Sequence, residues 1–116
     1  MALPWWIPFG AVPEVTCAAL AEQLRGERRP VVLDVRTALE FAAGHLDGAV
    51  NVPITRLARA LPGLALGPDR PVVAICLSAH RSIPALRLLQ RHGLEARQLA
   101  GGMLAWRAAG LPERRR

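Results

Sequence analysis

Cysteine is scarce in this chain of 116 residues, which holds only Cys17 and Cys76 and has no CxxC motif. Two distant thiols do not make a disulfide framework, and they favour a reducing compartment in which a thiol can stay reactive. Apolar residues make up 52% of the chain. At this length, that composition predicts one domain with its own core, and neither two domains nor a disordered chain.

Long apolar runs are missing as well. No stretch of about 18 apolar residues occurs, so the sequence predicts no membrane span. The apolar N-terminal arm, residues 1–14, lacks a basic segment and is interrupted by Pro4, Pro8 and Pro13, so it is unlike a signal peptide. We therefore expect a cytoplasmic protein.

Lysine and tyrosine are absent and aromatic residues make up 4% of the chain, although the net charge is +6. An excess of arginine can attract anions over long distances. The arginines are scattered, apart from a basic tail at residues 113–116, and no aromatic residues alternate with them as in single-strand-binding proteins. Abundant Ala, Arg, Leu, Pro and Gly indicate codon bias, so we expect no nucleic-acid partner.

Short strands alternate with short helices along residues 15–112. Residues 30–35 and 71–76 are apolar, β-branched runs, which are typical of strands buried on both faces. Shorter strands are expected at residues 49–53 and 95–100. Helices are expected from Thr16 to Gly26, at residues 38–45, at residues 55–64 with a break at Pro62, from Ser82 to Gln90, and around Trp106. This order predicts an α/β fold with a central parallel sheet and helices on both faces.

Cys76 ends the second buried strand, at the edge of the sheet where such folds bind ligands. The loop CLSAHRS, residues 76–82, leads from it directly into a helix. The N–H groups of residues 77–81 and the Arg81 guanidinium can stabilise a thiolate, an oxyanion or an anionic persulfide there. In the alternative interpretations, Cys76 is an inert core residue, or Arg81 braces the loop by binding carbonyl groups or an acid. The loop and Arg81 together favour a reactive site.

Three blocks of the sequence carry a resemblance to a known family. They are LDVRTALEFAAGHLDGAVNVP at residues 33–53, CLSAHRS at residues 76–82 and LAGGMLAWRAAGLP at residues 99–112. In this order and spacing they resemble the motifs of the rhodanese-like sulfurtransferases. The resemblance spans most of residues 15–112 and implies a single rhodanese domain around a parallel sheet of about five strands.

The resemblance also implies a reaction and a site. Cys76 would accept a sulfane sulfur from a small donor such as thiosulfate and pass it, through a persulfide, to cyanide or to a thiol, which could belong to another protein. The candidate substrate-binding residues are Leu77, Ser78, Ala79, His80 and Arg81 of the loop, together with Arg36. No cofactor is expected, and no metal either, because no histidine has metal-ligand spacing with a cysteine or carboxylate.

Two features of the loop bear on competing functions. Ala79 stands where the family usually has glycine, and a positive φ there would strain the loop by about 1 kcal/mol. The spacing from Cys76 to Arg81 is C-x4-R, whereas the related cell-cycle phosphatases and arsenate reductases have C-x5-R, and the loop holds no general acid. The short spacing and the missing general acid disfavour a phosphatase-like enzyme. The second hypothesis is a sulfur-carrier or binding module with little turnover, which a hidden or strained loop would favour.

Several other polar residues admit two interpretations. Arg36 either lies at the rim of the pocket and steers an anion, or makes a structural ion pair. Asp34 is expected to satisfy Arg81 or nearby amides, and Ser82 to cap the helix that follows the loop, although the hydroxyls of Ser78 and Ser82 could also donate to the thiolate. A contact of His80 with substrate is left open.

Trp5 and Trp6 lie in the N-terminal arm. We expect them to pack across the domain. A homodimer through the arm is the alternative to a monomer, because exposed tryptophan is a strong interface anchor, and contact of the arm with a membrane surface is also left open.

Overall fold

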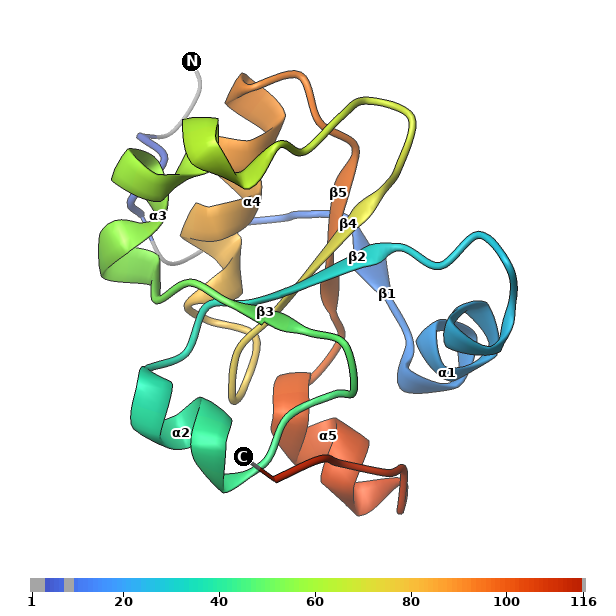
Figure 1. The fold of residues 1–116 in the computed structure, drawn as a ribbon. Coiled ribbons are helices and arrows are strands. Elements are labelled where there is room, and N and C mark those ends of the chain that lie inside the picture. Colours follow the sequence, from blue (N-terminus) through green and yellow to red (C-terminus); the bar gives the residue numbers. More distant parts are fainter. Residues whose placement is uncertain (1–3, 8–9, 116) are drawn as a thin grey trace.

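Five parallel strands form the sheet in the order β1-β5-β4-β2-β3 in the computed structural model, which describes residues 4–7 and 10–115 (Figure 1). The strands are β1 (Glu14–Val15), β2 (Val31–Asp34), β3 (Val50–Asn51), β4 (Val72–Ile75) and β5 (Ala96–Leu99). The helices are α1 (Cys17–Arg25), α2 (Ala38–Ala43), α3 (Ile54–Ala60), α4 (Ser82–Arg91) and α5 (Gly102–Ala108), with a 3₁₀ turn at Leu61–Leu64. The expected α/β fold is confirmed.

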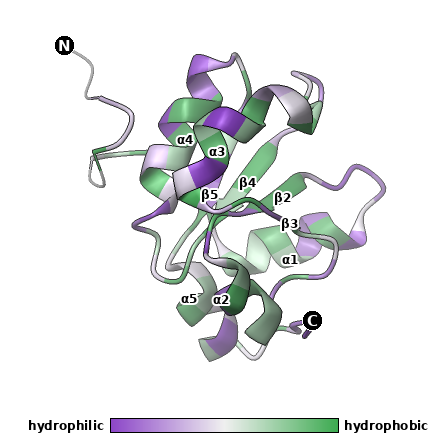
Figure 2. Ribbon diagram, turned by 60° about the vertical axis from the view of Figure 1, so that its left-hand side comes forward, coloured by the Kyte–Doolittle hydropathy of each residue, from purple (hydrophilic) through white to green (hydrophobic). Residues whose placement is uncertain are grey.

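Helices cover both faces of the sheet. Figure 1 shows α3 and α4 on one side and α1 and α5 on the other. Alternate residues of β4 therefore enter two separate cores: Val72 and Ala74 pack beneath α3 and α4, whereas Val73 and Ile75 pack beneath α1 and α5. The central strands need apolar side chains on both faces, which explains their continuous hydrophobic runs (Figure 2).

Local signals set several boundaries of the helices. Thr16 caps α1 by accepting a hydrogen bond from the Ala19 N–H, as expected. The helix α3 ends at Ala60, and Pro62 lies in the 3₁₀ turn that follows, so the expected break is confirmed. Thr37 and Glu40 form a capping box at the start of α2, which the Thr-x-x-Glu pattern signals and which is not among the predicted features.

The strand β1 was also missed. Glu14 and Val15 pair with Gln98 and Leu99 of β5, at the edge of the sheet. Two residues are too few to show the alternation that identifies a strand, so only the tertiary pairing reveals β1. Its consequence for the site is that Glu14 lies beside Gln98.

The N-terminal arm is described only at residues 4–7 and from residue 10 onward. Trp5 packs against the core beneath α4, as expected, and the Arg87 side chain donates to the carbonyl oxygens of Pro4 and Ile7. Trp6 is 61% exposed, so the expectation that it packs is wrong. No helix in the described ranges is long and apolar enough to cross a membrane.

Candidate active site

The loop at residues 76–82 connects β4 to α4, and it lies beside α2 and α5 in Figure 1. Its first two carbonyl groups face α5: the Met103 N–H donates to the Cys76 oxygen at 2.9 Å, and the Leu104 N–H donates to the Leu77 oxygen at 3.0 Å. Within the described part of the chain, the N–H groups of residues 77–81 have no hydrogen-bond acceptor. The loop is thus anchored through its carbonyls and keeps its amides available for an anion.

Gly102 makes this anchoring possible. A Cβ atom at this position would lie 2.5 Å from the Cys76 oxygen and 2.6 Å from the Leu77 oxygen, and the residue has a φ of +61°. Only glycine combines this backbone conformation with such a close approach. The Gly101-Gly102 pair is part of the third sequence block that carries the family resemblance, but the sequence gives no sign that Gly102 contacts the carbonyls of the loop.

The Cys76 side chain is buried, with 1% of the residue exposed, and it contributes to the core beneath α4. Its Sγ lies 3.5 Å from the Ser82 Oγ. Both interpretations of Cys76 thus describe part of its position: the thiol is packed like a core residue, and it sits at the start of the loop whose amides are free.

Ser82 does not cap α4, which corrects the expectation. The N-cap position is occupied by Arg81, which makes no side-chain cap, and Ser82 is the first helical residue. The Ser82 side chain points inward to the sheet, where its hydroxyl donates to the Gln98 Oε1 at 2.6 Å. Gln98, which the sequence reading did not single out, therefore belongs to the surroundings of Cys76.

The outer part of the loop is strained and exposed. Ala79 has a φ of +67°, a conformation that favours glycine, so the strain considered for this position is present. Ser78 and His80 are exposed, and the Ser78 hydroxyl hydrogen-bonds to the His80 Nδ1 at 3.0 Å. These two polar side chains bind each other on the outside of the loop.

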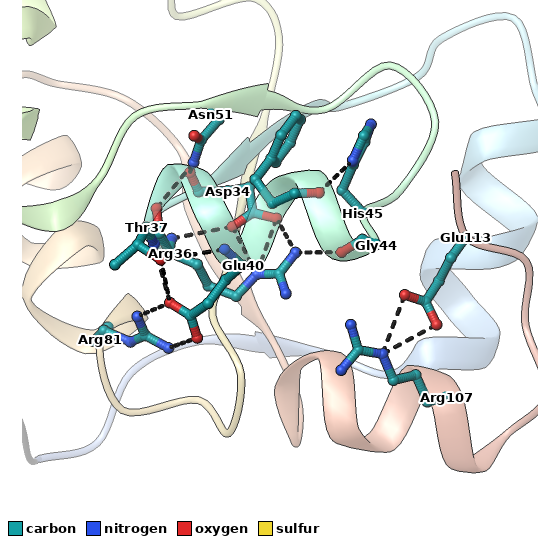
Figure 3. A network of polar contacts seen from close by, with 11 residues as sticks. Asp34, Arg36, Thr37, Glu40, Gly44, His45, Asn51, Arg81, Arg107 and Glu113 are labelled. Atoms are coloured by element: carbon teal, nitrogen blue, oxygen red, sulfur yellow. Dashed lines mark hydrogen bonds and ion pairs between the residues drawn. The ribbon is translucent and has the colours of Figure 1, made fainter. Parts of the chain in front are cut away.

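Arg81 braces the loop by binding an acid, one of the two roles considered for it. Its guanidinium donates to both carboxylate oxygens of Glu40 in α2, at 2.5 and 2.8 Å (Figure 3). The hydrogen bonds from Arg81 lower the pKa of Glu40 from 4.5 to about 2, and Glu40 in turn raises the pKa of Arg81. An electrostatic interaction with Cys76 also contributes to the raised pKa of Arg81, so the guanidinium and the Cys76 side chain act on each other.

Arg36 and Asp34 form a buried ion pair and do not line the loop. Arg36 is 1% exposed and Asp34 is fully buried. The Arg36 guanidinium donates to both Asp34 oxygens and to the Gly44 carbonyl, at 2.7 to 3.2 Å (Figure 3). Arg36 therefore does not stand at a pocket rim. Asp34 binds the Arg36 guanidinium instead of Arg81, and its Oδ1 also accepts a hydrogen bond from the Arg36 backbone N–H at 3.0 Å, so the expected contact with a nearby amide is confirmed. A fully buried arginine needs its partners to offset desolvation, which explains the inward position.

Other candidate groups lie apart from the loop. The half-buried Cys17 side chain packs against the core beneath α1 and α5, and burial raises the pKa of its thiol. His45 stacks on Phe41 and hydrogen-bonds to its carbonyl oxygen at 2.7 Å. Among residues 4–7 and 10–115, no group of three His, Cys, Asp or Glu side chains could hold a metal ion. A cavity of about 600 Å³ opens between α1 and residues 111–115, and no residue of the loop lines it.

The sequence is similar to a known domain family and to individual proteins. The rhodanese-like domain model matches residues 17–109. The chain is 43% identical over 83 residues to an HTH-type transcriptional regulator of Mycobacterium tuberculosis, covering 70% of this chain and 36% of the regulator. It is 36% identical over 93 residues to thiosulfate sulfurtransferase 16 of Arabidopsis thaliana, covering 69% of this chain and 76% of the relative.

One solved structure is similar to this chain over nearly the whole length of the solved protein. The rhodanese-related protein of Thermoplasma volcanium superposes with a TM-score of 0.80 at 28% identity, covering 89% of this chain and 98% of that protein. The chain spans only about a third to a half of some curated relatives, so it corresponds to one part of those longer proteins.

Proposed function

The chain belongs to the rhodanese-like domain family, and on that premise we propose that it is a sulfurtransferase that forms a persulfide on Cys76. The family and its sulfurtransferase relatives support a general role in sulfur transfer. The finer proposal is that the sulfur comes from a small donor such as thiosulfate and goes to cyanide or to a thiol, which a partner protein could supply.

The proposed reaction has two displacement steps. The Cys76 thiolate attacks the outer sulfur of thiosulfate, the S–S bond of the donor breaks, and sulfite leaves with the bonding electron pair. The transferred sulfur stays on Sγ as an anionic persulfide. A cyanide ion or thiolate then attacks this terminal sulfur, and Sγ leaves as a thiolate again. No cofactor takes part in this scheme.

The observation that carries the proposal is the position of Cys76 at the start of a loop with free amides. The N–H groups of residues 77–81 have no acceptor within the described residues, so they are available to hold the terminal sulfur. Ser78, Ala79 and His80 would contact the donor from the loop, and Arg81 would act through its charge while Glu40 holds it in place. Arg36 has no part in this proposal, because it is buried in the ion pair with Asp34.

A carrier or binding module with little turnover is the second candidate. Two observations favour it: Cys76 is 1% exposed, and Ala79 strains the loop with a φ of +67°. A phosphatase-like enzyme is disfavoured, because the loop has the short C-x4-R spacing and Arg81 is bound to Glu40.

The two unpaired cysteines suit a reducing, cytoplasmic setting. The exposed Trp6 is compatible with a monomer and with a homodimer formed through the arm.

Mass spectrometry of the intact protein tests the proposal. After incubation with excess thiosulfate, the chain should gain the mass of one sulfur atom, and cyanide should then remove it. The gain should be absent in Cys76→Ala and present in Cys17→Ala, because Cys17 lies in the other core. A stable gain without steady turnover would favour the carrier module. No gain with thiosulfate, mercaptopyruvate or a polysulfide would overturn the persulfide proposal.

A further inference from the structure

A chain of hydrogen bonds runs from Cys76 to an exposed glutamate on the edge strand. The Cys76 Sγ lies 3.5 Å from the Ser82 Oγ, and the Ser82 hydroxyl donates to the Gln98 Oε1 at 2.6 Å. The Gln98 Nε2 donates to the Glu14 Oε2 at 2.7 Å. Ser82 and Gln98 are buried, whereas Glu14 is exposed. Four side chains, from the loop after β4 and from α4, β5 and β1, thus form one connected chain, which we call the Glu14 relay.

The chemistry of these groups determines where each hydrogen lies. A carboxylate only accepts hydrogen bonds, so Glu14 requires the NH₂ group of Gln98 to face it. The Gln98 carbonyl oxygen must then face Ser82, and the single hydrogen of the Ser82 hydroxyl is used to reach it. Toward Cys76, the Ser82 oxygen can therefore only accept, and the partner that fits is a protonated S–H group.

The geometry points to a new role for Glu14, which rests on Cys76 being the nucleophile: we propose that Glu14, acting through Gln98 and Ser82, biases the resting Cys76 toward the thiol. Against a thiolate, the Ser82 oxygen would present only its lone pairs unless the hydroxyl turned toward the sulfur, and that turn would leave the buried Gln98 oxygen without a donor. Gln98 cannot rotate to compensate, because its oxygen would then face the Glu14 carboxylate. Glu14, Gln98 and Ser82 are positioning residues in this scheme.

Other charges act on the same sulfur from the surrounding elements. Arg81 lies in the loop and interacts electrostatically with Cys76, and Asp34 at the end of β2 is bound to Arg36. His80 is exposed on the outside of the loop and binds Ser78, and Glu40 on α2 is bound to Arg81. Unlike these charged groups, Glu14 is connected to Cys76 through a continuous chain of side-chain hydrogen bonds. Its effect therefore depends on Ser82, whereas a simple electrostatic effect does not.

The test measures the thiol–thiolate equilibrium of Cys76 by the ultraviolet absorbance of the thiolate across pH. It uses the Cys17→Ala protein, in which Cys76 is the sole thiol, and the absence of tyrosine removes an interfering signal. Glu14→Gln keeps the shape of the side chain and frees Gln98 to turn. It should shift the equilibrium about fivefold toward the thiolate, which is the worth of one ordinary hydrogen bond.

Coupling to Ser82 separates the relay from a general charge effect. In a Ser82→Ala background, Glu14→Gln should have no effect, and Gln98→Leu provides the same comparison if Ser82→Ala does not fold. Glu22→Gln is the matched control, because it removes an exposed glutamate of α1 that pairs with Arg25. An unchanged equilibrium in Glu14→Gln, or an equal shift with and without Ser82, would overturn the relay. No sulfur donor is used, so the result can be read whether or not the persulfide proposal holds.

Discussion

Arg81 and Glu40 are 41 positions apart in the chain, yet the Arg81 guanidinium donates hydrogen bonds to both oxygens of the Glu40 carboxylate. The same Glu40 carboxylate accepts a hydrogen bond from the Thr37 N–H at 3.0 Å and so closes the capping box of α2. One side chain therefore starts a helix and holds the arginine of the candidate active-site loop (Figure 3). The start of α2 and the conformation of the loop are coupled through this carboxylate.

The first prediction concerns the pH dependence of this ion pair. The pKa of Glu40 is lowered from 4.5 to about 2 in the folded chain, so the pair stabilises the fold above pH 4.5 and loses this contribution as the pH falls toward 2. At neutral pH, Glu40→Gln should reduce the free energy of unfolding by about 1 kcal/mol, since the Arg81 and Glu40 side chains are 34% and 31% exposed. Urea unfolding of both proteins across pH measures the difference.

The difference between the two proteins should close as the pH approaches 2. Glu22→Gln is the control for this series, because its pair with Arg25 is 77% and 70% exposed and contributes only a few tenths of a kcal/mol. A difference between Glu40→Gln and the unmodified chain that is the same at all pH values would show that the ion pair is not its source.

The second prediction concerns the strain at Ala79. Because the φ of Ala79 is +67°, Ala79→Gly should raise the free energy of unfolding by about 0.5 to 1 kcal/mol. This net gain is the strain energy that glycine relieves, minus the cost of the greater conformational freedom of glycine in the unfolded chain. Ala109→Gly is the matched control: its φ is −79°, so the substitution should destabilise the chain. Thermal or urea unfolding decides the sign, and a loss of stability in Ala79→Gly would contradict the strain.

The third prediction concerns the contact between Gly102 and the loop. Gly102→Ala should displace the carbonyls of Cys76 and Leu77, lower the free energy of unfolding by about 2 to 4 kcal/mol and abolish persulfide formation. Gly110→Ala has a similar φ of +71° but nothing within 4 Å of the added Cβ, so it should cost only about 1 kcal/mol and leave persulfide formation intact. Equal effects of the two substitutions on both readouts would show that the close approach does not hold the loop.

The fourth prediction separates the structural role of Arg36 from a role in binding. Arg36→Met leaves the buried Asp34 carboxylate without its guanidinium, which should cost about 3 to 5 kcal/mol of unfolding free energy. Arg25→Met on the exposed surface of α1 should change stability by less than about 0.5 kcal/mol. A stable Arg36→Met protein with a raised KM for thiosulfate would restore Arg36 to the pocket rim.

Much of the fold follows from local features of the sequence. The apolar runs that become β2 and β4, the Thr16 cap and the break at Pro62 were readable because each depends on neighbouring residues alone. The position of Cys76 at the end of a buried strand was readable for the same reason, and with it the candidate active-site loop. The resemblance of three sequence blocks to the rhodanese-like family then identified the chemistry expected of that loop.

The sequence by itself thus determined the order of the helices and of the strands β2 to β5, and the position of Cys76 at the end of a strand whose loop leads into a helix. Only the tertiary structure decided which polar groups surround this thiol. The Ser82 hydroxyl donates to Gln98, Gln98 on β5 donates to Glu14 on β1, and Arg81 donates to Glu40 on α2. Periodicity and capping report on residues within a few positions of each other, whereas these partners are 16 to 84 positions apart. A hydrogen bond between distant residues exists only once the packing of the sheet and its helices has brought its donor and acceptor together.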